Sequence, residues 1–182
     1  MQHTVAVLVE NHFGVLTRVA GLFSARGFNI DSLAVGETQD PEVSRITVVA
    51  NGDDRVVEQI MKQLNKLVDV IRVEDLTAKE MISRELVLIK IGANAANRND
   101  IMHVVTTFRA KIVDVSPDSL TIEVTGSEGK IDAMLELLRP FNLREVVRTG
   151  QIAMARRGEL KAPSKTGVKA SNSKKAKKSK KK

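Results

Sequence analysis

The order of strands and helices repeats along this chain, and the repeat constrains the fold more than any other feature. In the first half, short segments rich in Val and Ile predict four strands: residues 4–9, 30–35, 44–50 and 70–76. Apolar residues at helical spacing predict two helices between them, one with Leu16, Val19, Ala20 and Phe23 on one face and an end at Gly27, the other with Val57, Ile60, Met61, Leu64 and Leu67.

The second half shows the same order. Residues 86–91, 111–115, 120–124 and 143–148 predict strands, and one helical face carries Ile101, Val104, Val105 and Phe108. A second face, Ile131, Met134, Leu135 and Leu138, matches Val57, Ile60, Met61 and Leu64 at a constant offset of 74 residues, and its helix ends before Pro140. Each half reads βαββαβ. The chain is therefore expected to be α+β, with two ferredoxin-like domains in tandem, residues 1–78 and residues 84–160.

A ferredoxin-like sheet carries both helices on one face and leaves the other face and an edge strand open. Strands this rich in Val and Ile are unsuited to water contact on such a surface. We therefore expect at least a homodimer.

Charge is distributed unevenly. The chain carries a net charge of +7, but residues 161–182 contain ten Lys and no acidic residue, which leaves residues 1–160 with 19 basic and 22 acidic side chains. The Lys-rich segment, residues 161–182, has too little apolar surface to fold and is predicted to be a disordered tail. Because no secretory signal and no long apolar run is visible, we expect a cytoplasmic protein.

Few residues of this sequence are candidates for a catalytic or metal site. Cys is absent, which excludes disulfides, thiolate metal sites and Cys nucleophiles. The three His, at positions 3, 12 and 103, show no metal-ligand spacing and are interpreted as surface or hydrogen-bonded residues. Nucleophile-elbow, phosphate-loop and dinucleotide motifs are missing too. We predict no catalytic residue, no metal site and no cofactor on this chain.

One loop is suited to binding. Residues 10–16, between the first strand and the first helix, end at a helix N-terminus, where free N–H groups and the helix dipole favour a carboxylate. Gly14 allows close approach of the backbone, and Asn11 offers a donor and an acceptor. An ordinary strand-to-helix turn, capped by Asn11, explains the same residues. The corresponding segment of the second half, residues 92–99, has a different composition.

Residues 9–33, VENHFGVLTRVAGLFSARGFNIDSL, resemble the opening of an ACT domain. Together with residues 40–47 and 63–70, and with a second ferredoxin-like domain in place of a catalytic one, they resemble the family of small, regulatory subunits of acetolactate synthase. In that family the ACT domains pair side by side, and a feedback amino acid, typically valine, binds at the seam. The resemblance implies that one subunit contributes Asn11, Gly14, Val15 and Leu16, and the other contributes Asn29 and Ile30.

The resemblance also implies a partner. A separate catalytic (large) subunit would carry thiamine diphosphate, Mg²⁺ and FAD and form acetolactate in branched-chain amino acid biosynthesis. This chain would be a non-catalytic part of that transferase complex, which it would activate and make sensitive to allosteric feedback inhibition by valine.

Two other functions are open. A free-standing ACT-domain sensor could regulate another enzyme, although no helix-turn-helix supports control of transcription. RNA-recognition modules also use a βαββαβ sheet, but they stack bases on strand aromatics. The five Phe fall outside the predicted strands and residues 1–160 are net acidic, so nucleic-acid binding is disfavoured. An enzyme would need a site that these patterns do not reveal.

Overall fold

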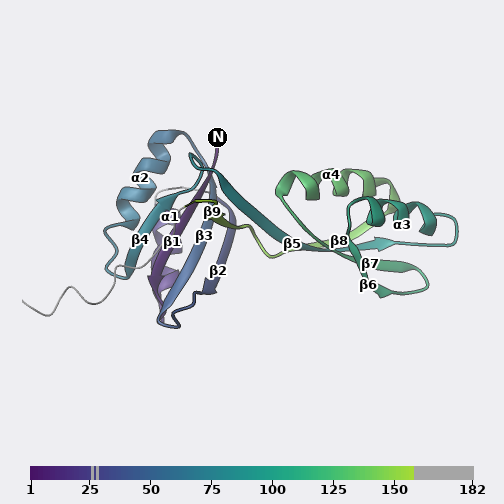
Figure 1. Ribbon diagram of the computed structural model, residues 1–182, viewed down its shortest axis with the longest axis horizontal. Coiled ribbons are helices and arrows are strands. Elements are labelled where there is room, and N and C mark those ends of the chain that lie inside the picture. Colours follow the sequence, from purple (N-terminus) through teal and green to yellow (C-terminus); the bar gives the residue numbers. More distant parts are fainter. Residues whose placement is uncertain (26, 28, 158–182) are drawn as a thin grey trace, which may run out of the picture.

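The computed structural model describes residues 1–157, except residues 26 and 28 (Figure 1). The predicted Lys-rich tail, residues 161–182, lies outside the described residues. Two βαββαβ units follow one another along an elongated molecule, which confirms the predicted tandem ferredoxin-like α+β fold.

The first unit is a four-stranded antiparallel sheet in the order β2-β3-β1-β4. Its elements are β1 (Gln2–Glu10), α1 (Val15–Ala25), β2 (Ile30–Glu37), β3 (Val43–Asn51), α2 (Asp54–Leu64) and β4 (Val70–Asp75). Odd-numbered residues of β1 pack with both helices in one core, since successive side chains of a strand point to opposite faces. β2 and β4 are the edge strands, so β2 has one side without a partner strand within the described chain.

The buried face of α1 differs from the prediction. Val15, Val19 and Phe23 are buried, whereas Leu16, predicted to face the core, is 44% exposed. Leu16 lies at the rim because the i, i+4 row through Val15 and Val19 defines the centre of the packed face. Gly27, with φ +69°, follows the helix in the left-handed conformation typical of a helix end, as predicted.

The second unit has its own core and the strand order β6-β7-β5-β8. Its elements are β5 (Met81–Gly92), α3 (Arg98–Thr107), β6 (Lys111–Val115), β7 (Ser119–Gly126), α4 (Glu128–Leu138), a 3-10 turn (Arg139–Phe141) and β8 (Leu143–Arg148). Both helices lie on one face of this sheet (Figure 1). On the opposite face Leu88 is paired with Val147, and these side chains are 38% and 51% exposed.

A strand that the sequence did not predict, β9 (Ile152–Ala155), closes the fold. It pairs with Met81–Arg84 at the beginning of β5, and Ala153 packs with Ala6 and Leu76 of the first unit. The expectation that the second face of the first sheet is open is therefore wrong over this region. β5 and β9 together form a ribbon that covers it, and the Arg45 guanidinium donates to the Ala153 carbonyl at 2.6 Å.

His3 contradicts its interpretation as a surface or hydrogen-bonded residue. It is 4% exposed, and neither ring nitrogen has a hydrogen-bond partner in the described part of the chain; the nearest charge is Asp54, 3.8 Å from Nε2. An unsatisfied buried polar group costs about 1–3 kcal/mol. We expect His3→Leu, which is similar in size, to raise the free energy of unfolding in urea by about 1 kcal/mol. A loss of stability would show that the contact with Asp54 outweighs the desolvation.

None of the described helices is long and apolar enough to cross a membrane.

Candidate functional site

The loop between β1 and α1 is held against the turn that joins β2 to β3. The Asn11 N–H donates to the Glu42 carbonyl at 2.7 Å, and its side-chain amide donates to the Pro41 carbonyl at 2.9 Å and to a Glu37 carboxylate oxygen at 3.2 Å. Both amide hydrogens are used within the chain, which leaves the side-chain oxygen of Asn11 as the group that can accept a further hydrogen bond. The loop therefore lies beside the end of β2.

Gly14 adopts φ +86°, a left-handed conformation that L-residues rarely take. A Cβ at this position would lie 3.3 Å from an Arg18 guanidinium nitrogen, so the backbone here is covered by that side chain. Val15 follows and packs into the core, while Leu16 is partly exposed beside it. The first turn of α1 thus offers backbone N–H groups, a guanidinium and an apolar side chain on one surface.

Arg18 belongs to a charged network that the sequence did not predict. Its Nε donates to one Asp69 carboxylate oxygen at 2.6 Å, and the other oxygen lies 3.1 Å from His12 Nε2, which is also 3.3 Å from Glu10. The hydrogen bond from Arg18 is the main cause that holds the Asp69 pKa below its usual value; burial opposes it, and the charges of Arg18 and His12 add smaller lowering effects. Asp69 fixes the loop by joining it to the segment before β4.

The low Asp69 pKa predicts a pH dependence. A carboxyl group whose pKa is lower in the folded protein stabilises the fold above its unfolded-state pKa, about 3.9, and this contribution is lost as the pH falls through the folded value. We expect Asp69→Asn to lower stability at pH 7 and to flatten the loss of stability below about pH 4. Urea unfolding from pH 3 to 7 measures this, with Asp114→Asn as the exposed control. Parallel pH curves for wild type and Asp69→Asn would contradict the assignment.

Glu10, His12 and Asp69 also form the single group of potential metal donors found among the described residues, with donor atoms within 4.8 Å of one another. His spacing could not indicate it, because Asp69 is distant in the sequence. Arg18 already neutralises Asp69, and a second cation beside a guanidinium is disfavoured. The contacts are those of an ion-pair network that orders the loop. The absence of a metal site stays a prediction.

Asn29 and Ile30 lie at the other end of the sheet. Ile30 begins β2 opposite Ala50, whereas Glu37, next to Asn11, ends it opposite Ser44. Seven residue steps of a strand span about 23 Å. Within one chain, the structure therefore brings together Asn11, Gly14, Val15 and Leu16, and separates them from Asn29 and Ile30. The Asn29 amide donates to Asp31 at 2.8 Å, which leaves its side-chain oxygen as an acceptor.

Comparisons with known proteins find matches to both domains of this chain. Residues 5–72 match the family model of the AHAS small subunit-like ACT domain, and residues 84–157 match that of the small subunit of acetolactate synthase. A probable acetolactate synthase small subunit from Methanothermobacter thermautotrophicus is 54% identical over 85% of this chain and 92% of its own length. The acetolactate synthase small subunit of Mycobacterium bovis is 50% identical over the same shares.

A solved structure has the same fold. The crystal structure of the acetolactate synthase small subunit from Thermotoga maritima superposes with a TM-score of 0.80 at 40% identity, and covers 87% of this chain and 99% of that chain. The repeated βαββαβ units, the two matched family models and relatives of this identity lead to one conclusion: this chain belongs to the family of acetolactate synthase small subunits.

Proposed function

We propose that this chain is the regulatory subunit of an acetolactate synthase, which activates a separate catalytic subunit and makes it sensitive to valine. The observation that carries the proposal is that the family match spans both domains, while the loop before α1 presents ligand-binding groups at a helix N-terminus. The thiamine diphosphate, Mg²⁺ and FAD of the reaction would belong to the catalytic chain.

The position of β2 supports a site made by two chains. β2 is an edge strand whose Val35 side chain is 47% exposed, and an edge strand is a ready template for pairing with a second copy. If two β2 strands pair antiparallel, the start of one lies beside the end of the other. Asn29 and Ile30 of one subunit then come next to the loop that Asn11 attaches to Glu37 of the other. A homodimer of this kind completes a site that one chain leaves in two halves.

The chemistry of the two halves suits an aliphatic amino acid. The N-terminus of α1, with Arg18 beside it, favours the carboxylate, and the side-chain oxygens of Asn11 and Asn29 can accept from the ammonium group. Leu16 and Ile30 offer apolar surface, and burying a valine side chain contributes about 1.5–3 kcal/mol. Val15 packs into the core, so in this proposal it positions the helix start rather than covering the ligand.

Activity of the reconstituted complex tests the proposal. The purified chain should raise the acetolactate-forming activity of its catalytic subunit, and valine should lower that activity again. Because coupling between two binding equilibria is reciprocal, calorimetry should show weaker valine binding in the presence of the catalytic subunit. A chain that binds valine but neither binds nor activates the catalytic subunit would instead be a free-standing ACT sensor. Absence of both effects would overturn the proposed function.

A further inference from the structure

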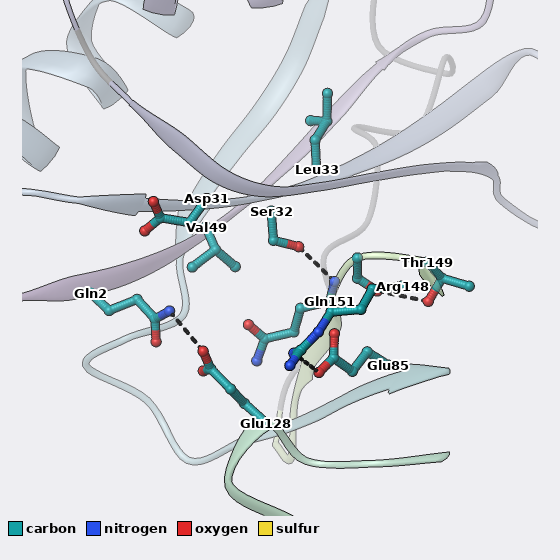
Figure 2. Close-up of a pocket in the computed structure, with 11 residues that line it drawn as sticks. Gln2, Asp31, Ser32, Leu33, Val49, Glu85, Glu128, Arg148, Thr149 and Gln151 are labelled. Carbon is teal, nitrogen blue, oxygen red and sulfur yellow. Dashed lines mark hydrogen bonds and ion pairs between the residues drawn. The ribbon is translucent and has the colours of Figure 1, made fainter. Parts of the chain in front are cut away.

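The two domains meet around a cavity of about 300 Å³ (Figure 2). Its walls come from β1, β2 and β3 of the first domain and from β5, α4, the end of β8 and the segment after β8 in the second. The segment after β8, residues 149–151, is the place where the chain leaves the second sheet and turns to become β9. We call these three residues the strap.

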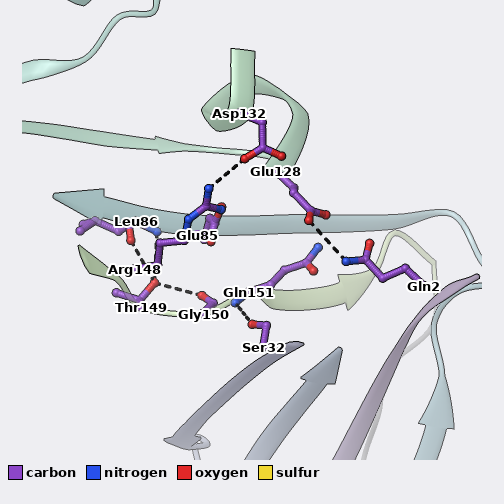
Figure 3. Close-up of polar contacts among 10 residues, drawn as sticks. All are labelled: Gln2, Ser32, Glu85, Leu86, Glu128, Asp132, Arg148, Thr149, Gly150 and Gln151. Atoms are coloured by element: carbon purple, nitrogen blue, oxygen red, sulfur yellow. Dashed lines mark hydrogen bonds and ion pairs between the residues drawn. The ribbon is translucent and has the colours of Figure 1, made fainter. Parts of the chain in front are cut away.

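The strap is fixed to the second domain at its beginning. Thr149 is bonded to the backbone of Leu86, and the preceding Arg148 guanidinium donates to Glu85 at 2.7 Å and to Asp132 at 2.8 Å (Figure 3). Glu85 is buried, and its burial raises its pKa against the opposing effect of Arg148. The start of the strap therefore moves with β5 and α4.

The end of the strap is fixed to β2 of the first domain. The Gln151 N–H donates to the Ser32 hydroxyl at 2.7 Å (Figure 3). Gly150 has φ +84°, and a Cβ there would lie 2.9 Å from the Leu33 carbonyl oxygen and 3.1 Å from Ser32 Oγ. Glycine is thus required at this position both by the backbone angle and by the close approach to β2.

Asp31, the residue before Ser32, accepts a hydrogen bond from Asn29 of the proposed ligand site. The two Asp31 carboxylate oxygens accept from the Asn29 amide at 2.8 Å and from the Asn51 amide at 2.5 Å. Asp31 therefore orients Asn29. It is also adjacent to Ser32, which accepts the hydrogen bond from the strap. A shift of the strap would move the start of β2, and the orientation of Asn29 with it.

We propose that Gly150 and Ser32 are positioning residues that couple the ligand-binding start of β2 to the placement of the second domain. The proposal rests on the proposed function, because it takes Asn29 and Ile30 as effector residues. Valine at Asn29 would favour one placement of the second domain, and a change in that placement would alter valine affinity. Coupling between sites typically changes affinity by about 5- to 150-fold.

The test uses the full-length chain with two variants. Gly150→Ala adds a methyl group that would clash with the Leu33 carbonyl oxygen. Ser32→Ala removes only the hydroxyl that accepts from the Gln151 N–H. Gly129→Ala is the matched control, because a Cβ on this residue of α4 meets nothing within 4 Å. Valine affinity is measured by calorimetry. We expect about fivefold weaker binding for the two strap variants and no change for the control.

Domain placement is measured separately by distances between two spin labels. The chain has no Cys, so Lys62→Cys on α2 and Glu136→Cys on α4, both exposed, give one label in each domain. Labelled chain is mixed with an excess of unlabelled chain so that intersubunit distances do not contribute. We expect a narrow distance distribution in wild type and in Gly129→Ala, and a broader one in Gly150→Ala and Ser32→Ala.

Each outcome decides one point. Unchanged distances in both strap variants would overturn the role of the strap. Broadened distances with unchanged valine affinity would overturn the coupling. If wild type binds no valine, the valine-sensing part of the proposed function fails, and the coupling to Asn29 fails with it, whereas the distances still report whether the strap holds the domains together.

Discussion

Replacing Ala153 with Lys is expected to unfold the first domain at lower denaturant concentration, although Ala153 lies at the opposite end of the described chain. Its side chain is 6% exposed and packs with Ala6 and Leu76, which are both fully buried. A Lys at this position would bury an ammonium group without a partner. The Arg45 guanidinium already donates to the Ala153 carbonyl at 2.6 Å, and burial lowers the Arg45 pKa against the opposing charge of Glu74. We expect a loss of about 3 kcal/mol.

The neighbouring residue provides the control. Met154 is 58% exposed on the other face of β9, so Met154→Lys is expected to change stability by less than about 0.5 kcal/mol. The chain has neither Trp nor Tyr, so urea unfolding is followed by far-ultraviolet circular dichroism rather than by intrinsic fluorescence. Equal midpoints for the two Lys variants would mean that β9 does not cover the first sheet in solution.

Periodicity predicted most of the fold because each domain obeys local rules. Alternating apolar residues in β7, and helical spacing in α2 and α4, follow one buried face each. β1 is buried on both faces, because β9 and the start of β5 cover its second face. β9 has no such signal. It has four residues, two of them Ala, and its strand conformation is determined by pairing with β5 and by packing on the first sheet. Contacts of this kind depend on tertiary structure, which a local pattern does not encode.

In the candidate site, too, features set by local sequence could be predicted and features set by tertiary contacts could not. The helix N-terminus, Gly14 and Asn11 could be predicted from residues 10–16, because glycine and an amide at a strand-to-helix turn have local meanings. Arg18 and Asp69 could not, since their ion pair joins α1 to the segment before β4. The exposure of Leu16 was also missed, because one helical face can be drawn through either Leu16 or Val15. The strap contact between Ser32 and Gln151 joins the two domains and has no sequence signature.

A second large effect, on valine affinity, is expected when Asn11 or Asn29 is replaced. Losing one hydrogen bond to a charged ligand group costs about 1.5–3 kcal/mol, so Asn11→Ala and Asn29→Ala should each weaken valine binding by at least tenfold. Asn65→Ala, at the exposed position that directly follows α2, is the matched control and should leave binding unchanged. Each asparagine variant is first measured alone by calorimetry, as a protein in which every chain carries the same change.

Mixing the two variants distinguishes a site made by two chains from a site within one chain. Two affinity tags allow a dimer to be purified in which one chain carries Asn11→Ala and the other Asn29→Ala. If each site combines Asn11 of one chain with Asn29 of the other, both changes fall in one site and the second site is intact. Such a dimer should bind half as much valine as wild type, at wild-type affinity. If each chain had a complete site, both sites would be damaged and no tight binding would return. In one chain β2 holds Asn29 about 23 Å from the loop of Asn11, so recovery of half the binding would require that the loop and the start of β2 meet across the subunit boundary.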